Sequence, residues 1–436
     1  MSFQPRDLVA VLFAASLLAL MQVGHFIIYN PFVSGPDGDP VAEYFTLAQY
    51  VFPAACVFAG IWRNSGVLNL SGILAFTPFL ALAAASTLWS VDAGLTLRST
   101  FLLIAFLLAV TTTTRAVGAV RTASILAHIM GLAMVVSALL ALFVPSIGQH
   151  NIDDLVQGEH VGSWRGLFAH KNSLGAYAAF AVVIVLAFRD RLPRWTVLPY
   201  LTAAIACVLF SNSTTSLVAA IFGVFSMSVA LPLMRRTSAQ LAAAGMGALL
   251  LCAGATLTAV TMLGWGELFA GTKVETLTGR TEIWTVALDI FLSRPLLGVG
   301  FGAGSSFARP VLQEMTFAEA VDPHSGYLAM LLDLGVVGLV LFLLPAALAF
   351  SRLLRMRGTI DRVQAVAGTA LLMSLMGAIT EVSPFLVQGS AGFFYFFSLV
   401  LLQLSRQASA RPLESAGAGT PDANRQPPRP PNSPMY

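Results

Sequence analysis

Residues 8–29, LVAVLFAASLLALMQVGHFIIY, decide the class of fold. The stretch contains one histidine and no formally charged side chain, and about 20 such residues span the ~30 Å hydrocarbon core of a bilayer. Of the 436 residues in the chain, 57% are hydrophobic and 10% are charged, whereas soluble domains carry about 25% charged residues. Too few polar side chains are present to cover a water-soluble fold. The sequence therefore predicts a polytopic membrane protein.

Further apolar blocks, separated by charged breaks, predict an all-α fold with about 12 transmembrane helices. The blocks lie near 8–29, 44–62, 67–89, 97–114, 122–144, 173–188, 196–211, 215–234, 239–263, 326–350, 363–380 and 391–405. Basic residues favour the cytoplasmic side, and most of the 24 Lys and Arg residues fall in the loops on the side of the N-terminus. Both termini are therefore expected in the cytoplasm.

The chain divides into four parts on this basis. Residues 1–263 hold the first nine helices and an outer loop at 145–172. Residues 264–325 form a long outer loop with short helices, and residues 326–405 hold the last three helices. The tail, 406–436, is rich in proline and poor in large apolar side chains, so we expect it to be disordered.

The first outer loop ends in a cluster of cations and amide donors. Arg165, His170, Lys171 and Asn172 lie within eight residues at the start of a predicted helix. Such groups attract an anion strongly where water is scarce. Two other interpretations remain open. The loop would be an interfacial anchor if its aromatic side chains lay at headgroup level, namely those of Trp164 and Phe168. Asn172 would then only cap the helix.

The second outer loop contains GRTEIW (279–284) and a glycine series at 298, 300, 302 and 304. Residues 281–293 have helical apolar spacing and predict an amphipathic helix near the membrane plane. Arg280 would stand at the start of this helix, where backbone amides favour anions. Trp284 would stack on a sugar ring or anchor the loop, and we favour anchoring. The glycines indicate tight turns, either in an irregular loop or close to a ligand.

His324 directly precedes the tenth span and is the best candidate for a general base, because neutral imidazole accepts protons near neutral pH. The histidines at 25, 128, 150 and 160 belong to no comparable group in the sequence.

Acidic pairs offer a competing metal hypothesis. Asp37 and Asp39 have a spacing that suits a divalent cation beside a diphosphate, but they lie in a Pro/Gly-rich turn, SGPDGDP, which we favour as the explanation. Asp153 and Asp154 are interpreted in the same way. Asp333 lies inside a predicted span and should face the bundle interior, where it either holds helices together or lines a polar cavity. No nucleotide-binding or nucleic-acid-binding motif is present in the sequence.

Several of these blocks together resemble the bacterial O-antigen ligase superfamily. They are RGLFAHKN (165–172), GRTEIW (279–284), RPLLGVGFG (294–302) and HSGYLAMLLDLGVVG (324–338), with STLWSVDAGLTLR (86–98) as a further segment. The resemblance covers most of the membrane region. Polymerases, protein O-oligosaccharyltransferases and some proposed transporters share these motifs. The modest chain length resembles the ligase more than the larger protein O-oligosaccharyltransferases.

The resemblance implies a glycosyltransferase of the bacterial inner membrane with a periplasmic active site. It would move O-antigen polysaccharide from undecaprenyl diphosphate to the lipid A-core oligosaccharide, without metal or other cofactor and without nucleic acid. By motif match, Arg165 and Arg280 would bind the diphosphate, with Lys171 as an auxiliary cation. His324 would activate the acceptor hydroxyl. His170, Asn172 and Trp284 would support the site.

Three alternatives remain. A polymerase would use the same donor with a second lipid-linked glycan as acceptor. A transporter of a small anion or lipid-linked sugar is disfavoured, because the motifs cluster at one face and no internal repeat is found. A cell-wall polymerase of the elongation and division group would also use undecaprenyl diphosphate substrates, but the motifs fit it less well.

Overall fold

The computed structural model describes residues 5–21, 40–63, 70–151, 160–230, 275–316, 322–355, 361–379 and 389–409. Within these residues every element is helical apart from one isolated β-bridge, between Gln149 and Trp164. The prediction of an all-α fold is confirmed for this part of the chain.

The helices fall where the apolar blocks predict them. They are α1 (Pro5–Leu20), α3 (Pro40–Arg63), η1 (Leu74–Phe76), α4 (Thr77–Ala85), η2 (Ser86–Leu88), α5 (Ala93–Val117), α6 (Ala119–Phe143), α7 (Pro145–Gly148), α8 (Lys171–Phe188), α9 (Arg194–Phe210), α10 (Thr214–Phe225), η4 (Ser226–Ala230), α13 (Glu275–Leu292), α14 (Gly304–Met315), α15 (Gly326–Arg355), α16 (Arg362–Gly377) and α17 (Ser390–Ser409). The predicted span at 239–263 and the tail beyond residue 409 lie outside the described residues.

Four of the described helices are long and apolar enough to cross a membrane. They are Ala93–Val117, Ala119–Phe143, Lys171–Phe188 and Gly326–Leu353, and shorter apolar helices lie at Thr46–Trp62, Leu74–Leu88, Arg194–Phe210, Thr214–Ser228 and Gly392–Ser405. These four helices are candidate membrane spans, while the number twelve remains a prediction.

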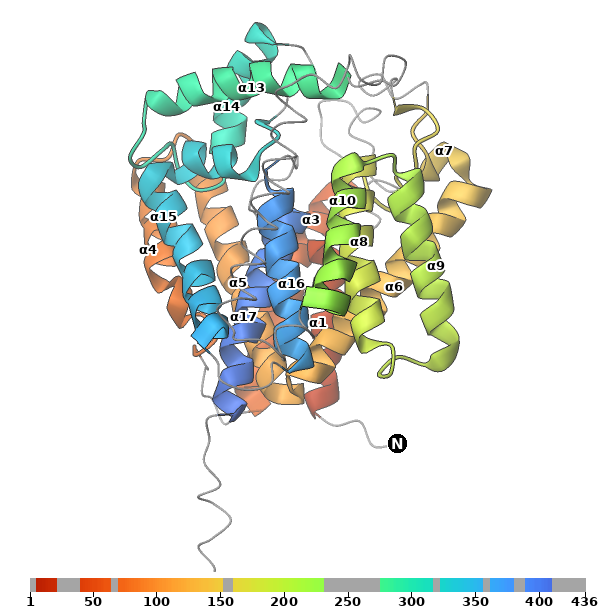
Figure 1. Cartoon of the computed structure of the whole chain (residues 1–436). Helices are drawn as coiled ribbons and strands as arrows, with labels where there is room; N and C mark the ends of the chain where they lie inside the picture. Colours follow the sequence, from red (N-terminus) through yellow and green to blue (C-terminus); the bar gives the residue numbers. More distant parts are fainter. Residues whose placement is uncertain are drawn as a thin grey trace, which may run out of the picture.

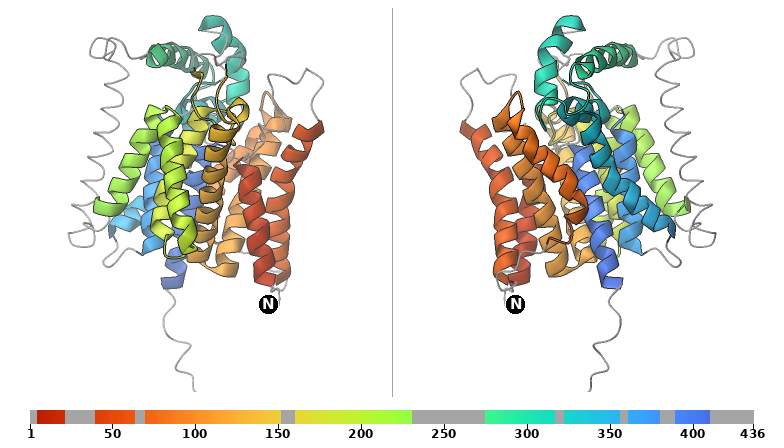
Figure 2. Two further views of the ribbon diagram at one scale, coloured as in Figure 1. Left: turned by 90° about the vertical axis from the view of Figure 1, so that its right-hand side faces the viewer. Right: turned by 90° about the vertical axis from the view of Figure 1, so that its left-hand side faces the viewer.

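The apolar helices form one bundle, and two further helices, α13 and α14, lie at one end of it, with α13 running across that end (Figure 1 and Figure 2). In Figure 1 the N-terminus is at the bottom of the bundle, whereas α7, α13 and α14 are at the top. Figure 2 shows the same arrangement from two sides. The helices that carry the sequence motifs, α8 and α15, both begin at this top end. The two predicted outer loops therefore share one end of the bundle.

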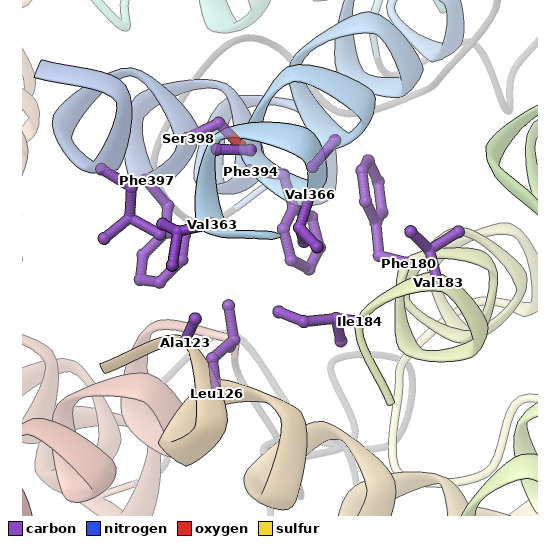
Figure 3. A pocket seen from close by; sticks show the side chains of 13 residues that line it. Ala123, Leu126, Phe180, Val183, Ile184, Val363, Val366, Phe394, Phe397 and Ser398 are labelled. Carbon is purple, nitrogen blue, oxygen red and sulfur yellow. The ribbon is translucent and has the colours of Figure 1, made fainter. Parts of the chain in front are cut away.

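The middle of the bundle is a packed aromatic and aliphatic core. Nearly every described side chain of α16 is buried, and so are those of α17 from Phe393 to Phe397. A helix that is apolar all round must be enclosed by others. The space that α6, α8, α16 and α17 leave between them is shown in Figure 3, and its volume is only about 10 Å³. Such a space holds about one water molecule, so it is part of the core.

The helix predicted near the membrane plane is α13, which lies across the end of the bundle in Figure 1. Its side chains Ile283 and Ala287 are fully buried, and they pack against Ala308 and Leu312 of α14 and Leu332 of α15. The apolar face of this amphipathic helix is thus covered by other helices of the same chain.

Candidate functional site

Two histidines cap the N-terminus of α8. His170 is the N-cap residue, and its Nδ1 accepts a hydrogen bond of 3.1 Å from the backbone N–H of Asn172. The Nε2 of His150 accepts one of 3.1 Å from the backbone N–H of Lys171. Because N–H groups in the first turn have no partner within the helix, each imidazole satisfies a donor that the helix leaves open. The interpretation of Asn172 as the cap is wrong: it is the second residue of α8.

His160 joins these two histidines in a cluster of three, which we call the histidine cluster. The ring centroids of His150 and His170 are 5.4 Å apart, those of His160 and His170 are 5.5 Å apart, and those of His150 and His160 are 5.9 Å apart. Backbone hydrogen bonds between His150 and the segment 162–163 fold the loop into this arrangement. The prediction that His150 and His160 belong to no constellation is therefore wrong.

Arg165 is buried, with 3% of its surface exposed. Its Nε donates to the carbonyl of Ile147 at 2.9 Å, and its backbone N–H donates to the carbonyl of Gly148. The guanidinium therefore links the end of the loop to α7. A buried charge of this kind interacts strongly with its surroundings, because the local dielectric is low.

The aromatic residues of the loop face the protein and not the headgroups. Trp164 is 7% exposed and stacks on Phe210 of α9, with a centroid distance of 4.7 Å. Phe168 is 3% exposed and stacks on Tyr177 of α8 at 4.9 Å. The anchor interpretation of these two side chains is wrong, because they fix the loop to the bundle.

Lys171 is the first residue of α8, and its Nζ lies 3.4 Å from the carbonyl of Asn212 in the turn between α9 and α10. The side chain of Lys171 is partly exposed. A partly exposed cation at a helix N-terminus adds to the positive end of the helix dipole. The end of the loop therefore combines a positive helix terminus, a buried guanidinium and an ammonium group.

His324 has an unusual backbone conformation at the start of α15. Its φ is 46°, in the left-handed region that few residues other than glycine adopt. The carboxylate of Asp322 stabilises it, since Oδ1 accepts the backbone N–H of His324 at 2.7 Å and lies 3.9 Å from the imidazole Nδ1. Two bonds fix the next turn to α16, from the N–H of Gly326 to the carbonyl of Ala378 and from the hydroxyl of Tyr327 to the carbonyl of Leu375. His324 is thus held by a strained turn of the kind that often occurs at functional sites.

Charged groups from the end of the first loop and from the start of α15 both act on His170. The pKa of His170 is lowered well below its ordinary value of 6.5, first by burial and then by the positive charges of its neighbours. These neighbours are His150, His160, Lys171 and His324. His324 therefore lies near the histidine cluster, although more than 150 residues separate it from Lys171 in the sequence. The end of the first loop and the start of α15, which both carry sequence motifs, therefore lie near each other.

The glycine series lies in tight turns that pack against α15. Asp333, 3% exposed, accepts hydrogen bonds from the backbone N–H groups of Gly302 and Gly304, the latter at 2.7 Å. It thereby stabilises the N-terminus of α14. Gly298 and Gly304 lie so close to α15 that a Cβ on either would be 2.5 to 2.6 Å from atoms of Asp333 or Leu332. Asp333 thus holds helices together, one of the two roles expected for it.

Part of the motif STLWSVDAGLTLR (86–98) completes this packing. We call the packed residues 86–92, 294–304 and 332–337 the glycine clasp. Trp89 Nε1 donates to the carbonyl of Leu297, and the N–H of Val91 donates to the carbonyl of Val299. On the other side, the N–H groups of Val336 and Val337 donate to the carbonyls of Pro295 and Leu296. Helix α15 is interrupted at Gly335, whose φ of 64° and ψ of −164° are not helical. The clasp holds the segment between α13 and α14 against α15.

Arg280 lies inside α13 and not at its start. The helix begins at Glu275, so Arg280 is in its second turn, and the argument from helix-terminal amides is wrong for this residue. The side chain of Arg280 lies outside the described part of the structure. Trp284, one turn further along, is partly buried against the core that α13, α14 and α15 share, and this supports the anchoring role.

The comparisons with known proteins address the same region. Residues 163–343, which include Arg165, Lys171, His324 and most of the glycine clasp, match the family model described as O-antigen ligase. This part of the chain is therefore similar to the O-antigen ligase family. The match supports the resemblance seen in the motifs.

One curated relative is named for exopolysaccharide production. The exopolysaccharide production protein ExoQ of Rhizobium meliloti (strain 1021) is 28% identical over 301 residues, which cover 64% of this chain and 66% of that protein. The match thus spans slightly less than two thirds of the relative's length. No solved structure matches the chain significantly.

The acidic residues of the competing metal hypothesis lie outside the described residues. These are Asp37, Asp39, Asp153 and Asp154. Among the residues that are described, no group of three His, Cys, Asp or Glu side chains is arranged to hold a metal ion. No regular spacing connects residues 150, 160 and 170 with 324, so the sequence alone gave no signal for the histidine cluster.

Proposed function

We propose that the protein is a lipid-linked glycan transferase that joins O-antigen polysaccharide, carried on undecaprenyl diphosphate, to the lipid A-core oligosaccharide. The observation that carries the proposal is the approach of His324 to the cationic start of α8 at one end of the bundle. A base and a set of cations are the two requirements for displacing a diphosphate from a sugar. We place this end of the bundle on the periplasmic side of the inner membrane.

The cations of the site are proposed to stabilise the leaving group. When the bond between the sugar and the diphosphate breaks, negative charge develops on the diphosphate oxygens, and fixed cations lower the barrier by meeting that charge. Lys171 is partly exposed and would contact the diphosphate directly. Arg165 is buried, so it would act as a fixed charge behind the site. We propose that Arg280, carried by α13, supplies the guanidinium fork that suits phosphate oxygens.

His324 is proposed to be the general base. Its imidazole would take the proton of the acceptor hydroxyl while the hydroxyl oxygen attacks the anomeric carbon and the diphosphate departs with the bonding electrons. Its side chain is 20% exposed and lies beside Asp322, whose negative charge would stabilise the imidazolium that forms. One base and one displacement invert the anomeric centre. The diphosphate is already an activated leaving group, so we propose no metal and no ATP.

A reconstituted assay tests this function. The protein in lipid vesicles receives undecaprenyl-diphosphate-linked glycan with or without lipid A-core acceptor, in the presence of a chelator. We expect glycan on lipid A-core only when the acceptor is added, and no loss of rate with the chelator. Absence of the product under all conditions, with a properly folded protein, would refute the proposal.

The second candidate is a polymerase, and the printed name of the relative ExoQ favours it, because exopolysaccharide production requires chain growth. The same active site would then use a second lipid-linked glycan as acceptor. In the assay above, longer lipid-linked chains would form from donor alone, and lipid A-core would have no effect. The acceptor decides between the two functions.

A further inference from the structure

We propose that His150 and His170 are positioning residues of the transferase site, and that they act as neutral imidazoles. In this state they cap α8 and hold the loop that carries Arg165 and Lys171 beside His324. The link to catalysis rests on the proposed function. The structural part, that the loop stays closed only while both rings are neutral, stands independently.

The hydrogen bonds define the protonation state of both rings. A backbone N–H is always a donor, so the ring nitrogen that faces it must carry a lone pair and no proton. The Nε2 of His150 faces the N–H of Lys171, and the Nδ1 of His170 faces the N–H of Asn172, both at 3.1 Å. The remaining proton of each neutral ring must therefore be on the opposite nitrogen, Nδ1 in His150 and Nε2 in His170. A second proton on either ring would remove the acceptor.

The surroundings also oppose a second proton. The groups whose charge acts on His170 are His150 and His160 within the loop, Lys171 at the start of α8, and His324 at the start of α15, which has Asp322 beside it. Apart from Asp322 all of them are cationic or become cationic in acid, and the helix N-terminus adds a further positive end. The pKa of His170 is lowered accordingly. The closed loop therefore binds fewer protons than an open one.

This difference predicts how the loop depends on pH. An exposed histidine in an open loop has a pKa of about 6.5, whereas the closed loop keeps its rings neutral to lower pH. Above about pH 6.5 both forms are neutral, and pH has no effect. As the pH falls below that value, each proton that only the open form binds lowers the ratio of closed to open loop about tenfold per pH unit.

Substitutions can keep the acceptor and remove the titration. Asparagine at 170 places an oxygen near the position of Nδ1 and is among the best N-cap residues. Glutamine at 150 places an oxygen near the position of Nε2. The variant with His150→Gln and His170→Asn should therefore keep α8 capped at every pH. A matched control is His128→Asn, because the Nδ1 of His128 also lies 3.2 Å from a hydrogen-bonding partner, the hydroxyl of Tyr200, but within the bundle.

The first measurement is hydrogen–deuterium exchange of the segment 160–175 in the full-length protein, from pH 7.5 to 4.5. Rates are corrected for the intrinsic effect of pH on exchange. We expect the wild type and His128→Asn to lose protection below about pH 6.5, by tenfold or more per pH unit, while the double variant keeps it. Equal loss in the wild type and the double variant, or constant protection of the wild type, would overturn the inference. If the double variant does not fold, the wild type and the two single variants give the same test.

The second measurement is the pH profile of glycan transfer. With each profile normalised to its own kcat at pH 7.5, we expect the acidic limb of kcat to become less steep in the double variant, because only the protonation of the base His324 then remains. An equally steep acidic limb in an active double variant would refute the positioning role in catalysis. If the exchange result is as expected but no protein transfers glycan, the proposed function fails and the structural inference stands.

Discussion

Replacing Gly335 by alanine should destabilise the glycine clasp. Gly335 interrupts α15 with a φ of 64° and a ψ of −164°, a region that is essentially reserved for glycine and costs other residues about 1–3 kcal/mol. An added Cβ would also lie 2.3 Å from the carbonyl carbon and oxygen of Leu296. Because these are backbone atoms, the two segments must separate.

The separation weakens the hydrogen bonds from Val336 to Pro295, of 2.9 Å, and from Val337 to Leu296, of 3.3 Å. At about 0.5–1.5 kcal/mol for each bond, added to the backbone strain, the total loss is about 2–6 kcal/mol. With an unfolding entropy of about 2.1 cal/mol/K per residue, this corresponds to a decrease in Tm of roughly 2–7 °C.

A thiol-reactive fluorescent dye measures this change in detergent, since Cys56 and Cys207 are buried in the fold and react only on unfolding. Gly368→Ala is the matched control. Gly368 lies within α16, a Cβ there would meet only Leu353 Cδ1 at 3.6 Å, and alanine is about 1 kcal/mol more favourable than glycine in a helix. Its Tm should be equal to that of the wild type or higher. A Tm of Gly335→Ala equal to or higher than that of the wild type would refute the structural role of the clasp.

Three further predictions concern the clasp and the first loop. Asp333→Ala should lower Tm more than Asp333→Asn. Alanine leaves two buried N–H donors unsatisfied, at about 1–3 kcal/mol each, whereas the asparagine oxygen still accepts a hydrogen bond. Equal Tm values of the two variants would contradict this role of Asp333. Trp164→Ala removes a buried ring, a change that costs about 3–5 kcal/mol. Hydrogen exchange should therefore rise in residues 160–170 before it rises in α16. An equal rise in both regions would contradict the expectation that the loop opens independently of the bundle. Arg165→Lys keeps the charge but loses the Nε–H donor to Ile147, so transfer should fall about tenfold or more, and full activity in an initial-rate assay would show that charge alone suffices.

The bundle itself was predictable because the bilayer imposes it. A segment that crosses the hydrocarbon core must satisfy its backbone hydrogen bonds internally, so each long apolar block has to be a helix. The blocks at 97–114 and 122–144 accordingly fall within α5 and α6. Helix ends were less predictable, since they depend on local caps and contacts. This is why Arg280, expected at a helix start, lies in the second turn of α13.

The site was predictable only as far as its motifs extend. Arg165, Lys171 and His324 stand out by residue type and position beside a predicted span. The histidine cluster does not, because it forms through the fold of the loop onto α8. The glycine clasp likewise joins residues that are far apart in the sequence, Trp89 with Leu297 (208 residues) and Ser86 with Phe301 (215 residues), and such contacts leave no periodic pattern. The long-range partner of a polar group is set by the tertiary structure and not by the local sequence.

The most direct test of the central claim separates donor binding from transfer at His324. His324→Gln keeps a hydrogen-bonding side chain but removes the base, and His128→Gln is the matched control within the bundle. We predict that His324→Gln still binds undecaprenyl-diphosphate-linked glycan as tightly as the wild type, while the rate of glycan transfer in vesicles falls about 10²–10⁴-fold and the control transfers normally. Transfer by folded His324→Gln at the wild-type rate would contradict the account, because the imidazole would then not be the base.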